Sequence, residues 1–121
     1  MHRRSFFAAL AVVASLALPA QAHHGWAWTT GGNIELTGLI ETAELGNPHG
    51  ILTVRAEDEI WTVEAGQPWR HDRAGLDERL LAPGTEITVI GEPAADVSRQ
   101  VVKAEQIIIG GETYVLYPDR T

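Results

Sequence analysis

The stretch GQPWRHDRAGLDERLLAPG, residues 66–84, decides the fold, because it interrupts a chain that otherwise alternates apolar and polar residues. Pro68 suits the first turn of a helix, and Gly75 can end one. The segment LDERLL (76–81) can add another helical turn before the APG triplet at 82–84 stops it. We therefore expect one short helical connection within a chain of strands.

Strands are predicted on both sides of this connection. Six segments show the alternation typical of half-buried strands, three before the connection and three after it: 33–45, 51–56, 60–65, 85–93, 100–110 and 113–117. Three strands, a helix and two or three further strands is the order of an OB-type barrel, in which a helix links the third and fourth strands. We predict an all-β fold with small α content, a five- to six-stranded OB-like barrel with a short helix between strands 3 and 4. An open sandwich or half-barrel is the main alternative.

Gly38 lies in the middle of the first predicted strand. Glycine at such a position often marks a bulge or the corner of a barrel. The segment GNPHG (46–50) then combines turn-forming residues and separates the first strand from the second.

Residues 1–22 have the organisation of a secretory signal peptide. Two arginines precede the apolar run FFAALAVVASLAL, and the AQA triplet at 20–22 gives the A-x-A pattern that a signal peptidase accepts. The run is shorter than the roughly 20 residues of a membrane-spanning helix, so an uncleaved anchor is the less favoured alternative. We predict export to the periplasm, no stable membrane insertion after cleavage, and a single mature domain over 23–121. The leader fits both the general secretory pathway and the twin-arginine pathway.

The predicted mature domain is acidic and contains no sulfur. The chain has a formal net charge of −7 at pH 7, and loss of Arg3 and Arg4 with the leader leaves −9. This charge repels phosphate backbones, so we expect no nucleic-acid partner, and it concentrates cations. There is no cysteine, and the only methionine, Met1, leaves with the leader. Any metal must therefore be held by histidine, carboxylate, amine or backbone groups.

Cleavage after Ala22 would expose His23 as the first residue, and its α-amine and imidazole could then chelate one ion together. Cu(II) suits nitrogen ligands in planar geometry and binds most tightly among the common divalent ions, so we favour Cu(II) over Zn(II). His24 can add an imidazole and the intervening amide, and His49 can add an imidazole from the 46–50 turn. The predicted metal ligands are His23, His24 and His49. Alternatively, the histidine pair is a solvated leader and His49 only caps its turn.

The other polar candidates receive structural roles. We expect His71, among the charges of RHDR, on a solvated helix face, and we expect Glu64 to pair with Arg73. Tryptophans can line a ligand face, although packing in the core or at the rim is their more common role; they are Trp26, Trp28, Trp61 and Trp69. Nucleophile-elbow, phosphate-loop, HExxH and calcium-loop motifs are missing from the sequence, so we expect no enzymatic activity and no catalytic residue.

The order of several short motifs resembles a family of small exported bacterial proteins of unknown function. The shared elements are a His-His pair followed by a small residue and an aromatic, an LTG strand, an NPH turn, a Trp three positions before a Glu, an R-x-G element, a Pro-Gly before a strand and a G-x-P. They match residues 23–26, 36–38, 47–49, 61 and 64, 73–75, 83–84 and 91–93. The loop AADVSR departs from the family pattern, which has Asp-Gly there. The resemblance implies an OB-like fold and export, and no established activity.

These observations predict an exported small β-barrel binding protein that binds Cu(II) or another divalent metal through its mature N-terminal histidine. The alternative is a module without metal, which binds a glycan, peptide or envelope protein on the barrel face through Trp61 or Trp69.

Overall fold

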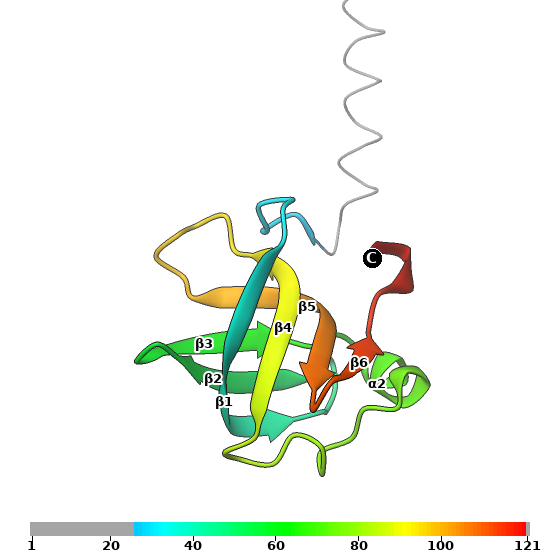
Figure 1. Ribbon diagram of the computed structural model, residues 1–121. Helices are drawn as coiled ribbons and strands as arrows, with labels where there is room; N and C mark the ends of the chain where they lie inside the picture. Colours follow the sequence, from blue (N-terminus) through cyan, green and yellow to red (C-terminus); the bar gives the residue numbers. More distant parts are fainter. Residues whose placement is uncertain (1–25, 121) are drawn as a thin grey trace, which may run out of the picture.

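Six strands form one continuous sheet in the computed structural model, which describes residues 26–120. The strands are β1 (Ile34–Glu44), β2 (Ile51–Ala56), β3 (Glu59–Glu64), β4 (Glu86–Pro93), β5 (Val101–Ile109) and β6 (Glu112–Val115). Their order in the sheet is β3-β2-β1-β4-β5-β6 (Figure 1). The predicted leader lies outside the described residues, and so do His23 and His24.

A parallel pairing between β3 and β5 closes the sheet into a barrel. Thr62–Glu64 pairs with Val101–Lys103, while the other strand pairs are antiparallel. The closed barrel contains β1 to β5, and β6 is an additional strand beside β5. This confirms the predicted all-β OB-like barrel, and closure excludes the open alternative.

The helix between the third and fourth strands is also confirmed. It is α2 (Pro68–Ala74), with Pro68 in its first turn and Gly75 in the left-handed conformation that ends it, at φ 82°. The further helical turn that we expected over 76–81 is wrong. The Asp77 side chain accepts a hydrogen bond from the backbone N–H of Leu80 at 3.1 Å and holds a turn there instead. Within residues 26–120, no helix is long and apolar enough to cross a membrane.

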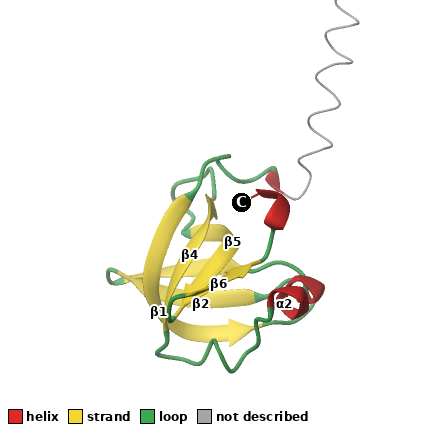
Figure 2. Ribbon diagram, turned by 45° about the vertical axis from the view of Figure 1, so that its right-hand side comes forward, coloured by secondary structure: helices red, strands yellow, loops and turns green. Residues whose placement is uncertain are grey.

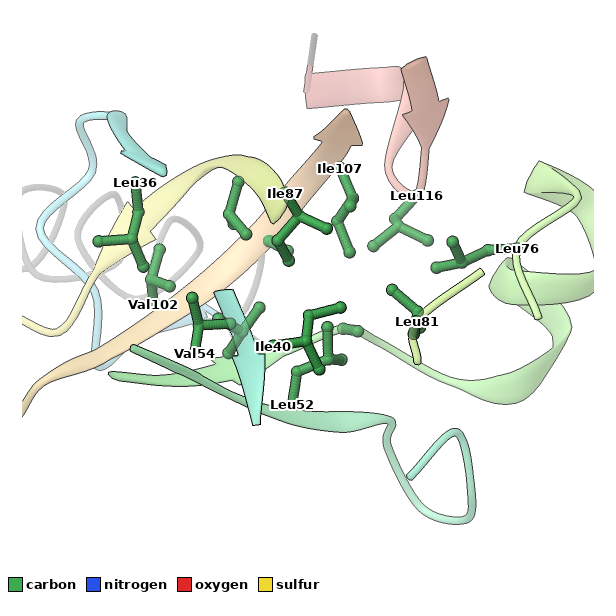
Figure 3. Close-up of a cluster of buried hydrophobic side chains, with 14 of the residues drawn as sticks. Leu36, Ile40, Leu52, Val54, Leu76, Leu81, Ile87, Val102, Ile107 and Leu116 are labelled. Carbon is green, nitrogen blue, oxygen red and sulfur yellow. The ribbon is translucent and has the colours of Figure 1, made fainter. Parts of the chain in front are cut away.

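The alternating apolar residues of the strands fill the barrel interior (Figure 3). Leu36 and Ile40 of β1 are buried, and Leu52, Val54 and Ile87 meet them from the neighbouring strands. Three leucines from outside the strands, Leu76, Leu81 and Leu116, complete the core on the side of α2. The 76–81 turn therefore contributes its two buried leucines to the core, although it is not helical.

Gly38 allows β1 and β2 to approach closely. A Cβ atom at this position would lie 2.4 Å from the backbone oxygen of Arg55. The β1–β2 register shifts shortly afterwards, between Ile40 and Thr42, which is the bulge expected in a strongly curved strand.

The two ends of the described chain meet at one end of the barrel (Figures 1 and 2). Thr29 bridges to Ala94 just beyond β4. The 3-10 helix η2 (Pro118–Arg120) follows β6 and brings the Arg120 guanidinium to 3.9 Å from the ring centre of Trp26. These contacts hold the N-terminal segment against the barrel from Trp26 onward.

Candidate functional site

A cleft of about 450 Å³ lies where the N-terminal segment meets the barrel. Its side chains come from the N-terminal segment, the β1–β2 turn, the end of β3, the start of α2, β5 and the chain after β6. They are Trp26, Trp28, His49, Glu64, Gln67, Arg70, Lys103 and Tyr117. The cleft thus joins residues that are far apart in sequence, as binding sites commonly do.

A buried ion pair forms the floor of the cleft. Glu64 and Lys103 are partners in the parallel β3–β5 pairing, and Lys103 Nζ donates a hydrogen bond to Glu64 Oε1 at 2.8 Å. Only 5% of the Lys103 side chain is exposed. Our expectation of a Glu64–Arg73 pair is wrong, because strand pairing brings Lys103 to Glu64, while the Arg73 guanidinium lies 4.9 Å from the ring centre of Trp69.

His49 faces this ion pair from the β1–β2 turn. Its Nδ1 lies 4.0 Å from Glu64 Oε1, and 38% of its side chain remains exposed. Of the three predicted metal ligands, His49 therefore lines the cleft. Across residues 26–120, no three histidine, aspartate or glutamate side chains are grouped as a metal site.

Arg70 is the second cation of the cleft, and sequence reasoning missed it. Its guanidinium stacks on two aromatic rings, 4.3 Å from the ring centre of Trp69 and 3.8 Å from that of Tyr117. Nε donates to Gln67 Oε1 at 2.8 Å, and Nη1 donates to the backbone oxygen of Leu116 at 3.1 Å. No carboxylate in the described part of the chain forms an ion pair with Arg70.

His71, the neighbour of Arg70, belongs to the interior. It is 2% exposed, and its Nε2 lies 2.8 Å from the backbone oxygen of Ala65. Since a carbonyl oxygen only accepts, Nε2 must carry the proton. The predicted solvated helix face is therefore wrong. Asp72 and Arg73 are exposed, whereas the imidazole packs so closely on Gly50 that a Cβ there would lie 2.7 Å from the ring.

A second polar cluster lies beside the cleft and also escaped prediction. Glu92 and Glu105 are 2% and 1% exposed, and both accept hydrogen bonds from Arg120. Thr29 Oγ1 donates to Glu92 at 2.6 Å. Burial raises the pKa of Glu92, but the hydrogen bonds from Thr29 and Arg120, and the charge of Arg120, outweigh it and hold this pKa below its ordinary value of 4.5. The cluster ties both ends of the described part of the chain to the barrel.

One sequence pattern could have revealed the buried charges. In VVKAEQIII, Lys103 and Glu105 are two positions apart in an apolar run, so they occupy the same face of one strand. Charges at such positions must be paired or exposed. Their partners could not be read from the run itself, because Glu64 and Arg120 come from other elements.

Two of the four tryptophans line the cleft and two do not. Trp26 and Trp28 line the cleft, and the Trp26 ring meets Tyr117 edge to face at 5.0 Å between centres. Trp61 is half-buried against the core. Trp69 is 51% exposed beside the two arginines of α2. The residues that we expected to form a ligand face, Trp61 and Trp69, therefore do not line the cleft.

A family model described as a family of unknown function, DUF6152, matches residues 10–103. No curated protein matches the chain by sequence. Two solved structures with a similar barrel are both of TiaS, a tRNA agmatidine synthetase. The ZRD-deleted mutant with agmatine gives a TM-score of 0.51 at 16% identity, over 69% of this chain and 26% of that one. The complex of TiaS with its tRNA, AMPCPP and agmatine gives 0.49 at 19% identity, over 64% and 18%.

Our expectation that the chain is not an enzyme is contradicted by the structure of the ZRD-deleted mutant, because TiaS is an enzyme that contains a similar barrel. The expectation rested on missing catalytic motifs, but a barrel without a catalytic motif can be part of an enzyme. This chain spans only about a quarter of the TiaS chain or less. At such identity the likeness shows the fold alone.

Proposed function

The chain belongs to the DUF6152 family of unknown function, and from that premise we propose that it is an exported periplasmic protein that binds a divalent metal ion, Cu(II) in preference to Zn(II). His23 supplies its α-amine and imidazole after removal of residues 1–22. His49 or His24 supplies the third nitrogen. The site is the mouth of the cleft beside the mature N-terminus.

The observation that carries this proposal is the position of His49 in the same cleft as Trp26 and Trp28. His23 precedes Trp26 by three positions, and an extended chain spans about 3.3–3.6 Å per residue. The His23 α-amine is therefore within about 10 Å of the anchored Trp26. Because Trp26 and His49 line the same cleft, we propose that this length of chain brings the N-terminal chelate to the imidazole of His49.

The carboxylate beside His49 is compatible with a metal. Its Nδ1 faces the carboxylate of Glu64, which leaves Nε2 on the opposite side of the ring. A carboxylate beside a ligating histidine is a frequent arrangement at metal sites, and here the 4.0 Å between Nδ1 and Glu64 Oε1 is longer than a hydrogen bond. The ammonium of Lys103 is already paired with Glu64, which reduces its repulsion of a cation.

Isothermal titration of Cu(II) into the chain from His23 to Thr121 tests the proposal. The same chain with one alanine before His23 lacks the amine–imidazole chelate and should bind at least about tenfold more weakly. His49→Ala should also weaken binding, whereas Glu86→Gln, an exposed control on β4, should not. Equal affinity of the native and extended chains would exclude an N-terminal chelate, and an unchanged His49→Ala variant would leave His24 as the third donor.

The alternative from the sequence, a module for a glycan, peptide or envelope protein without metal, stays a prediction. Trp61 and Trp69 do not line the cleft, so a partner that uses them would bind elsewhere on the barrel face. The expected absence of a nucleic-acid partner also stays a prediction, and it rests on the acidic charge of the domain.

A further inference from the structure

We propose that the cleft binds a small molecule that carries a carboxylate on a flat aromatic ring, with Arg70 as the anchor of the carboxylate. This inference goes beyond metal binding and does not depend on it, because it uses other side chains of the cleft.

Arg70 is held in place but its charge is not neutralised. Two of its nitrogens donate to Gln67 and to the backbone oxygen of Leu116. Both N–H groups of Nη2 remain without an acceptor among residues 26–120, although the guanidinium is half-buried and lines the cleft. Such a guanidinium is suited to an external carboxylate.

The surrounding polar groups favour an anion. Glu64 and Lys103 neutralise each other, so Arg70 gives this part of the cleft a net positive charge. The Gln67 side chain accepts a hydrogen bond from Arg70 through Oε1, which leaves its amide N–H groups free to donate. Arg70 and Gln67 therefore present donors, and the guanidinium is fixed before a ligand arrives.

The walls of the cleft favour a flat apolar body. Trp26, Trp28 and Tyr117 supply aromatic surface, and the volume of about 450 Å³ lies within the range of small-molecule sites. The edge-to-face contact between Trp26 and Tyr117 fixes the position of two of these rings. A carboxylate bound at Arg70 would place its ring against these walls, where stacking and apolar contact add to the charge interaction.

Benzoate is the probe that tests this inference, and benzamide is its neutral isostere. The chain from His23 to Thr121 is freed of metal and then dialysed, because carboxylate chelators would compete for the same site. Binding is measured by ligand-observed NMR and by tryptophan fluorescence. We expect saturable binding of benzoate and at least about tenfold weaker binding of both benzamide and acetate. Equal binding of benzamide would overturn the role of the carboxylate, and equal binding of acetate would overturn the role of the aromatic walls.

Variants of the two arginines on α2 complete the test. Arg70→Gln removes the anchor, and Arg70→Lys keeps the charge but loses the planar fork. Arg73→Gln is the matched control, because Arg73 contacts Trp69 but does not line the cleft. Both Arg70 variants should lose at least about tenfold in benzoate affinity while Arg73→Gln keeps it. Benzoate affinity in Arg70→Lys equal to that of Arg73→Gln would overturn the assignment, even if Arg70→Gln did not fold.

The metal proposal and this inference can fail separately. The chain with one alanine before His23 should bind Cu(II) more weakly and keep the benzoate affinity of the metal-free protein, because no side chain that lines the cleft is changed. Arg70→Lys should have the opposite pattern. If His49→Ala abolished benzoate binding while Arg70→Lys preserved it, the carboxylate anchor would be wrong, whatever the result of the Cu(II) titrations.

Discussion

Replacing Arg120 by methionine removes the cation that two buried carboxylates share. Glu92 and Glu105 are 2% and 1% exposed, and the Arg120 guanidinium donates to both, with 3.2 Å between Nε and Glu105 Oε2. Methionine keeps part of the apolar length of the side chain. The substitution therefore removes mainly the charge and its hydrogen bonds.

Removing one partner of a buried ion pair costs about 3–5 kcal/mol, because an uncompensated charge stays inside the protein. The Arg120 side chain is 29% exposed, so solvent screens part of this interaction. We expect the free energy of unfolding at pH 7.5 to fall by about 3 kcal/mol. Arg79→Met is the control. The Arg79 side chain is 93% exposed in its pair with Asp77, so its loss should cost no more than about 1 kcal/mol.

The cost of Arg120→Met should shrink as the pH falls. Without the cation, burial raises the pKa of the Glu92 carboxyl in the folded variant. If this pKa exceeds the unfolded value, the folded variant takes up a proton before the unfolded chain does, which stabilises it by up to about 1.4 kcal/mol per pH unit. In the unmodified protein the pKa of Glu92 is below 4.5, so this group supplies no such gain between pH 7.5 and 5.0.

Urea unfolding at pH 7.5 and pH 5.0, followed by tryptophan fluorescence, measures this change. The difference in unfolding free energy between the variant and the unmodified protein should be smaller at pH 5.0 by about 1 kcal/mol or more. The same difference at both pH values would refute the reasoning, because the carboxylates would then not be the source of the cost.

Three other predictions test the fold and its charges. The stabilisation from ionised Glu92 is present above its unfolded-state pKa and is lost as the pH falls through its lowered folded-state pKa. Glu92→Gln should therefore lose stability less steeply below about pH 4.5 in acid titrations followed by circular dichroism. An unchanged slope would count against this role of Glu92. Gly38→Ala should lower the free energy of unfolding in urea by at least about 2 kcal/mol, because its Cβ would lie 2.4 Å from the backbone oxygen of Arg55. Gly46→Ala is the control: its Cβ meets nothing within 4 Å, so the free energy of unfolding should change by about 0.5 kcal/mol or less. Leu52→Ala, in a fully buried position, should cost about 2–5 kcal/mol, and a cost below about 1 kcal/mol would contradict its place in the core.

The barrel could be predicted because its rules are local. Alternation places Leu36 and Ile40 on one face of a strand, and Pro68 and Gly75 limit the helix that links the third and fourth strands. Each of these patterns acts within a few residues. Their order along the chain was then sufficient to identify the topology.

The cleft could not be predicted in the same way, because its interactions join distant residues. Lys103 meets Glu64 only through the parallel β3–β5 pairing, and Arg70 meets Tyr117 only when the chain after β6 packs beside α2. His71 was predicted to be exposed because its neighbours in the sequence are charged. The orientation of the helix against the barrel buries the imidazole instead.

Native mass spectrometry of the protein exported by its own leader tests the central claim most directly. Purified from the periplasm of cells grown with copper, the protein should have the mass of a chain that begins at His23 and carries one Cu(II) per chain. Exchange of copper for zinc should lower the occupancy. A chain that begins at another residue, or a chain that begins at His23 and stays metal-free in the presence of stoichiometric Cu(II), would contradict the proposed site.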